Sequence, residues 1–80
     1  MKQFAKIFEL ENQEQVLVLR DYHAQIDEYY LIVRTDIAGI SFETKFVFDE
    51  EAKQIAAFKK FSKNDAITIR RSGIELYNKQ

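Results

Sequence analysis

The alternation of hydrophobic and polar residues is clearest between Ile40 and Asp49. One set of alternate positions is apolar apart from Thr44, and the other set is largely polar: Ile40, Phe42, Phe46 and Phe48 against Ser41, Glu43, Lys45 and Asp49. Successive side chains of a β-strand point to opposite faces. The pattern therefore predicts a strand with one face in the core and the other largely in water.

Three stretches before it also favour strands, because they are short, β-prone and bounded by polar residues. They are residues 3–10, 15–22 and 29–35, with the polar segment ENQE between the first two and DIAG leading from the third into the fourth. Short connections between consecutive strands are typical of an antiparallel arrangement. We expect a four-stranded antiparallel β-meander.

Residues 49–63 change to a helical pattern. Asp49 is a candidate N-cap, and basic residues gather where the helix dipole favours cations, near the end of the stretch. The apolar stripe consists of Ala52, Ile55, Ala56 and Phe58, with Phe61 at its border. This helix is expected to pack across one face of the sheet.

The last part of the chain returns to alternation, which favours a C-terminal β-hairpin. Residues 66–71 and 74–77 would be its strands, Ser72 and Gly73 its turn, and Arg70 would face Glu75. The predicted fold class is therefore α+β: an antiparallel β-meander of about four strands, then one helix packed on one face of the sheet, then a β-hairpin.

The expected core between sheet and helix consists of Phe42, Phe46, Phe48, Ile55 and Phe58. The second and third strands, however, are apolar on both faces, as in the run from Val16 to Leu19. One helix covers only one face, so the other face needs a cover. The pattern favours a homodimer, a sheet curved over itself, or an apolar binding surface.

Composition limits the classes of protein to consider. Eighty residues, 46% of them hydrophobic, predict a single folded domain spanning residues 1–80. Because the chain has no cysteine, it forms no disulfide, and a reducing cytoplasm fits best. No apolar run is long enough to span a bilayer. So small a chain is in keeping with a bacterial or phage protein.

Charge is unevenly distributed although the net charge is only −1. Residues 9–51 hold eleven acids and three bases, a balance of −8, whereas residues 53–71 hold six bases and one acid, a balance of +5. Such asymmetry indicates either an interaction surface or a protein whose halves complement each other on folding.

The segment DYHAQIDEYY, residues 21–30, holds the only histidine and three of the four tyrosines. One histidine is too few for a typical zinc site, no calcium-loop spacing is present, and no serine has the context of a nucleophile. We therefore expect no enzyme activity, no metal and no cofactor. The segment is either a solvated connection or a recognition loop, since tyrosine is enriched at protein interfaces. The candidate protein-binding residues are Tyr22, His23, Asp27, Glu28, Tyr29 and Tyr30.

A second candidate site is basic and comprises Lys59, Lys60, Lys63, Arg70 and Arg71. It could follow a phosphate backbone, although lysines at a helix end and arginines at a hairpin tip also serve solubility. The β-β-β-β-α order is similar to that of PUR-type and Whirly-type single-stranded nucleic-acid binders, a likeness of element order without a shared motif. The sequence thus favours a small protein-interaction module of the inhibitor, immunity or adaptor type, with single-stranded DNA or RNA binding as the alternative.

Overall fold

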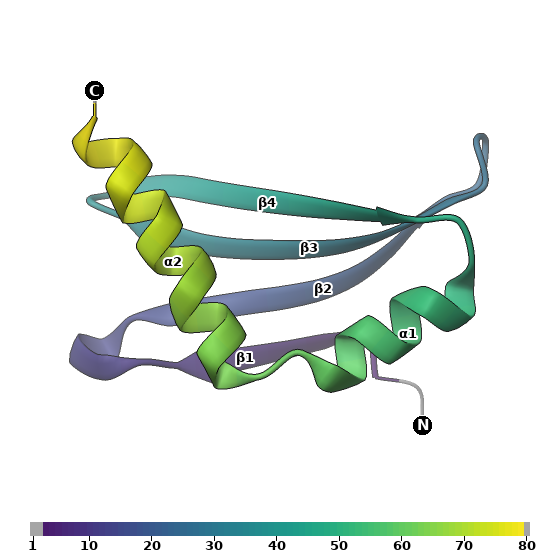
Figure 1. Ribbon diagram of the computed structural model, residues 1–80, viewed down its shortest axis with the longest axis horizontal. Coiled ribbons are helices and arrows are strands. Elements are labelled where there is room, and N and C mark those ends of the chain that lie inside the picture. Colours follow the sequence, from purple (N-terminus) through teal and green to yellow (C-terminus); the bar gives the residue numbers. More distant parts are fainter. Residues whose placement is uncertain (1–2, 80) are drawn as a thin grey trace.

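Four strands form one antiparallel sheet in the computed structural model, which describes residues 3–79 (Figure 1). The strands are β1 (Ala5–Glu9), β2 (Gln15–His23), β3 (Glu28–Ile37) and β4 (Ile40–Phe48), and their order across the sheet is β1-β2-β3-β4. The predicted meander is therefore confirmed. A 3₁₀ turn, Glu11–Gln13, occupies the polar segment between β1 and β2.

The turn between β3 and β4 has only two residues, Ala38 and Gly39, and both have positive φ angles, 53° and 79°. Two-residue hairpin loops favour such turns, because their twist matches that of the flanking strands. The pairing then runs without interruption from Ile37 opposite Ile40 to Tyr29 opposite Phe48. This long register fixes which side chains of β3 and β4 share a face.

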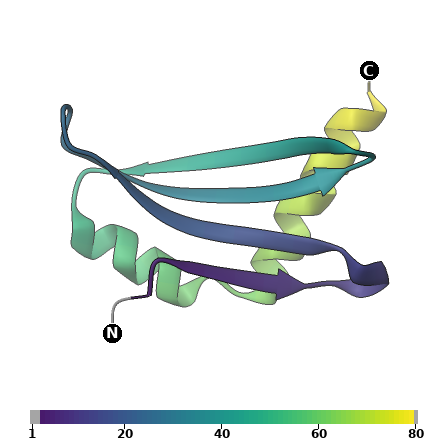
Figure 2. The same cartoon turned by 180° about the vertical axis from the view of Figure 1, so that it is seen from behind.

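Two helices, α1 (Glu51–Lys60) and α2 (Lys63–Asn78), lie on the same face of the sheet (Figures 1 and 2). The predicted C-terminal hairpin is wrong, because the residues assigned to it lie in α2. Its N-cap is Ser62, whose hydroxyl accepts a hydrogen bond from the Asp65 backbone N–H while the Asp65 carboxylate accepts one from the Ser62 N–H. This reciprocal capping box satisfies two backbone donors and starts a helix where alternation had favoured a strand.

Gly73, predicted to lie in a hairpin turn, sits inside α2 instead. A Cβ atom there would lie 2.8 Å from the Cδ1 atom of Ile37 and 3.8 Å from the Phe42 ring. Glycine thus lets α2 approach the sheet closely near the Ile40 end of β4. Arg70 and Glu75 occupy one helix and are not a cross-strand pair.

The core lies under the helices and over the middle of the sheet. Its buried members are Val16, Val18, Leu31, Val33, Phe58 and Ala66. Of the five residues predicted to form it, Phe58 is buried, Phe42, Phe48 and Ile55 are half-buried, and Phe46 is 40% exposed. Phe46 was therefore wrongly assigned: it faces the helices, but β4 is an edge strand over which they leave a hollow.

The buried face of α1 also differs from the predicted stripe. Gln54 and Phe58 are its buried residues, whereas Ala52 and Ala56 are exposed. Glu50, not Asp49, occupies the N-cap position, and the Asp49 carboxylate accepts a hydrogen bond from Lys53 Nζ at 3.0 Å.

Gln54 is 2% exposed and joins α1 to the two central strands. Its Nε2 donates to the backbone carbonyls of Asp21 (2.9 Å) and Tyr30 (2.7 Å), and its Oε1 accepts from Arg20 Nε at 3.1 Å. Both ends of the buried amide are therefore satisfied. Lys6 Nζ donates to the carbonyls of Phe58 and Phe61, which places a cation at the C-terminal end of α1.

Candidate functional site

The β2–β3 hairpin holds all six candidate protein-binding residues. Tyr22 and Tyr29 are opposite each other in the register, and their ring centroids are 4.6 Å apart. The Tyr22 hydroxyl donates to Asp27 Oδ1 at 3.0 Å, and Asp27 has a φ of 52°, as the tight end of the hairpin requires. These two rings lie on the helix side of the sheet, beside Gln54 and Glu51 of α1.

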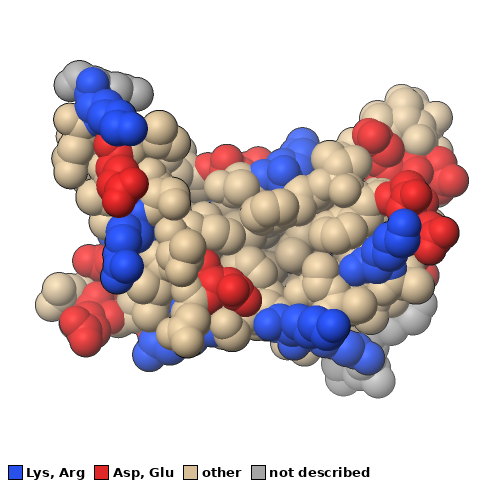
Figure 3. All heavy atoms as spheres, in the orientation of Figure 1, with Lys and Arg blue, Asp and Glu red and all other residues tan. Residues whose placement is uncertain are grey.

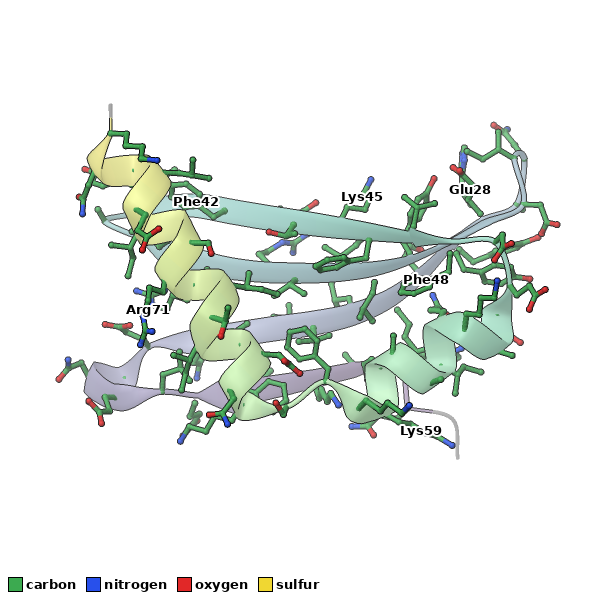
Figure 4. All side chains as sticks on the ribbon, viewed as in Figure 1. Glu28, Phe42, Lys45, Phe48, Lys59 and Arg71 are labelled. Carbon is green, nitrogen blue, oxygen red and sulfur yellow. The ribbon has the colours of Figure 1, made fainter. Side chains whose placement is uncertain are left out.

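Tyr30 lies on the opposite side of the sheet, here called the back face. Its hydroxyl donates to Glu28 Oε1 at 2.7 Å, and Lys45 Nζ sits 4.8 Å from the centroid of its ring. Glu28 faces His23 at the last pair of the β2–β3 ladder, and Figure 4 shows Glu28 at the hairpin end of the molecule. The six predicted residues are therefore close in space but divided between the two faces.

Hydrogen bonds raise the pKa of the two tyrosines further above the physiological range. Donation to Asp27 raises the pKa of Tyr22, and donation to Glu28 raises the pKa of Tyr30. Both phenols are therefore neutral donors at physiological pH. The ion pairs within the described residues 3–79 do not include Asp21, Asp27 or Glu28, so this end of the molecule holds three carboxylates without a basic partner.

The back face carries an apolar surface that sequence alternation predicted in part. Leu17 is opposite Ile7, and Leu19 is opposite both Ala5 and Ile32. We call Ile7, Leu17, Leu19 and Ile32 the back-face patch. Ile7 is 58% exposed, and Figure 2 shows the sheet with both helices behind it. Leu17 and Leu19 are half-buried and Ile32 is 8% exposed, so solvent reaches this patch mainly at Ile7 and along the two leucines.

Charged residues border the patch on the β3–β4 side. Arg34 Nη2 lies 2.8 Å from Glu43 Oε2, and Val47, 55% exposed, lies opposite Tyr30. Ile7 and Val47 were not singled out from the sequence. Alternation could have placed both residues on the back face, because residues two apart in a strand share a face. Ile7 stands two residues from Ala5 and Glu9, and Val47 stands two residues from Lys45.

The five basic candidate residues lie on the two helices, and none of them is at a hairpin tip. The Arg70 guanidinium donates to Thr35 Oγ1 and to the Asp36 carbonyl, and it pairs with Glu14 at 2.6 Å. Arg70 therefore fastens α2 to the sheet. Lys59 and Lys60 end α1, Lys63 begins α2, and Arg71 is exposed on α2.

These basic residues do not form one continuous strip. Figure 4 shows Lys59 and Arg71 at opposite ends of the helix face, and Figure 3 shows basic and acidic groups interspersed on that face. Lys63 and Arg71 share a shallow hollow with Glu11 and Glu14. A phosphate backbone following them would meet carboxylates.

Comparison with models of protein families, with curated protein sequences and with solved structures gives no match for the chain. Within residues 3–79, no helix is both long enough and apolar enough to cross a membrane. No three histidine, aspartate or glutamate side chains of that part of the chain come together as a metal-binding group.

Proposed function

We propose that this protein is a small, non-enzymatic interaction module of the cytoplasm that binds another protein across its back face. The observation that carries the proposal is the back-face patch, which neither helix covers because both pack on the other side, and in which Ile7 is 58% exposed. Burying an exposed aliphatic side chain of this kind is worth roughly 1.5–3 kcal/mol. Contiguous exposed apolar surface is typical of protein-binding sites.

Charge indicates the chemistry of the partner. Asp21 and Glu28 lie on the back face next to Tyr30, and Asp27 lies at the adjoining turn. These carboxylates are not ion-paired within the described residues. A partner that presents an apolar surface beside lysine or arginine side chains would complement both features. Tyr30 supplies a large apolar ring with a polar tip at the junction between them.

Single-stranded nucleic acid is less well supported as the ligand. The back face carries Asp21, Glu28 and Glu43, which would repel phosphates, and Arg70 is engaged within the fold. Binding of single-stranded nucleic acid is therefore kept as one of the possible results of the test described next.

The test compares three immobilised baits in a lysate of the source cells: the wild-type protein, Ile7→Lys and Ala56→Lys. Both substitutions add one positive charge at an exposed position, but Ala56 lies on α1 and Ile7 in the back-face patch. We expect a protein that the wild type and Ala56→Lys retain and that Ile7→Lys loses. Its retention should weaken as salt rises, because basic side chains contribute.

Two results would overturn the proposal. One is retained material that nuclease treatment removes, together with salt-sensitive binding of mixed-sequence single-stranded DNA or RNA by the purified protein. The other is a set of retained proteins that is the same for all three baits.

A further inference from the structure

The outer edge of β4 is unpaired within the described chain. β4 has nine residues, whereas β1, at the other edge, has five. Seven of the nine residues of β4 are exposed, among them Phe46 and Val47. A long edge strand presents a row of free backbone N–H and C=O groups, which another strand can pair with.

The sequence of β4 is nearly symmetric in chemical character about Thr44. One residue away on either side are Glu43 and Lys45, which have opposite charges, and two residues away are Phe42 and Phe46. Four residues away are Ile40 and Phe48, both apolar. An antiparallel strand of the same sequence would therefore meet it with matching partners at each of these positions.

We propose that a second copy of this chain pairs with β4 along that edge, antiparallel and centred on Thr44, to give a continuous eight-stranded sheet. Glu43 of each copy then faces Lys45 of the other on the back face. On the helix face, Phe42 faces Phe46 of the other copy. Opposite charges and aromatic side chains directly across a strand pair both favour pairing.

The neighbouring symmetric registers are disfavoured. Opposite residues must share a face of the sheet, so the centre of a symmetric pairing lies on one residue. Centring on Glu43 would place two glutamates opposite each other, and centring on Lys45 would do the same with two lysines. Like charges directly opposite are destabilising, so the charge pattern selects Thr44 as the centre.

The charges of β4 are available for this pairing. Lys45 sits over the Tyr30 ring and makes no ion pair within residues 3–79. Glu43 Oε2 accepts hydrogen bonds from Arg34 Nε and Nη2, and the Glu43 side chain is 43% exposed. A facing Lys45 would complete an alternating Arg34–Glu43–Lys45 row across the new sheet.

The helix face offers a second match. α2 crosses the sheet near the Ile40 end of β4, where Gly73 approaches Phe42, and its C-terminal end extends past the β4 edge (Figure 1). In the proposed register the Ile40 end faces the Phe48 end of the other copy. Each overhanging α2, with Leu76 60% exposed, therefore comes to lie beside the other copy's hollow.

That hollow is apolar and lies between α1 and α2. Leu31, Phe46, Phe48, Ala57 and Phe61 line it, with Lys60 and Asp65 at its rim. The space-filling view shows predominantly uncharged surface between the two helices (Figure 3). A dimer of this geometry would cover Phe46, which the monomer leaves exposed.

The first test is a charge exchange read by sedimentation equilibrium at tens of micromolar protein. Wild type should sediment with twice the 9.5 kDa mass of the chain. Lys45→Glu places glutamates opposite Glu43 at two symmetric positions and should raise the dimer dissociation constant about tenfold. The double exchange Glu43→Lys with Lys45→Glu restores opposite charges and should restore the dimer.

A single cysteine tests the register, because the chain has none of its own. In the proposed register the two copies of residue 44 face each other at a Cα separation of about 4.5–5.5 Å, which a disulfide can bridge. Thr44→Cys should therefore form a covalent dimer under mild oxidation. Ser41→Cys is the matched control on the same strand, since its two copies would be roughly 20 Å apart.

Three results would overturn the proposal: a monomeric wild type, a dimer that Lys45→Glu leaves unchanged, or equal cross-linking by the two cysteine variants. Ile7→Lys separates this proposal from the proposed partner binding, because Ile7 lies on β1 at the far edge. It should abolish capture of the partner and leave the dimer intact. A monomeric Ile7→Lys protein would place self-association on the back face instead.

Discussion

β2 and β4 have the same length, nine residues each, but very different surroundings. In β2, Val16 and Val18 are completely buried, although valine is a small side chain. In β4, which carries three phenylalanines, Phe46 remains 40% exposed. The difference comes from position: β2 is central and lies beneath the helices, whereas β4 is an edge. Alternation tells which face a residue is on, and sheet order decides how deeply it is buried.

The largest expected contrast is between two phenylalanines that both face the core side. Phe58→Ala should lower the free energy of unfolding by about 3–5 kcal/mol, because Phe58 packs in the core cluster. Phe46→Ala should cost about 1 kcal/mol or less in dilute solution, where its ring is already partly hydrated. Urea titrations monitored by circular dichroism would measure both values. Equal losses would show that Phe46 on β4 is packed as tightly as Phe58 in the core cluster.

This contrast also shows what the sequence could reveal. Alternation predicted four strands, their antiparallel order and the faces of Phe42 and Phe48, because each depends on local chemistry and short connections. The exposed fraction of the Phe46 side chain could not be predicted, since it depends on where the helices lie. Burial of Gln54, a polar residue, likewise depends on two carbonyls that only the folded sheet brings together.

The prediction of a C-terminal hairpin was wrong for a different reason. Ile67 and Ile69 alternate with polar residues, and Ser72 with Gly73 resembles a turn. The Ser62 to Asp65 spacing of the capping box is present in the sequence, but the hairpin was predicted from alternation and the Ser72-Gly73 turn alone. At the candidate site, alternation along one strand already separates Tyr29 from Tyr30, whereas the contact between Tyr22 and Tyr29 depends on the register of β2 and β3.

A smaller effect is expected at Gln54, which ties α1 to the central strands. Gln54→Leu keeps similar bulk but leaves the Asp21 and Tyr30 carbonyls without their donor. The expected loss is about 1–3 kcal/mol in the free energy of unfolding. Gln15→Leu, at an exposed position of β2, is the control and should change it little. A neutral Gln54→Leu would mean that the link between α1 and β2 is unimportant.

The capping box of α2 should contribute about 1 kcal/mol. Ser62→Ala removes the hydroxyl that accepts from the Asp65 N–H, and helix caps of this kind are typically worth that much. Because Gly73 of α2 lies close to Phe42 of β4, the loss should also loosen that end of the edge strand. Thermal unfolding would measure the change, with Ser72→Ala, on the exposed side of α2, as the control. No difference between the two variants would argue against the cap.

The smallest effect concerns pH. Because the folded-state pKa values of Tyr22 and Tyr30 are raised, their contribution to stability is complete below the unfolded pKa of roughly 10 and is lost as pH rises through the folded values. Ultraviolet absorbance of tyrosinate should follow this titration. Asp27→Asn should bring the pKa of Tyr22 back toward its ordinary value and leave Tyr30 unchanged. A Tyr22 titration unaffected by this substitution would refute the assigned hydrogen bond.

The central claim, that β4 is an open edge which a second copy closes, is tested most directly by amide hydrogen exchange of individual residues. Alternate N–H groups of β4 point away from β3, so in dilute monomer they should exchange quickly while the amides of β2 are protected. At concentrations where the sedimenting mass doubles, those same β4 amides should become protected, and the amides of β2 should change little. Outward β4 amides that exchange equally fast at both concentrations would contradict the account.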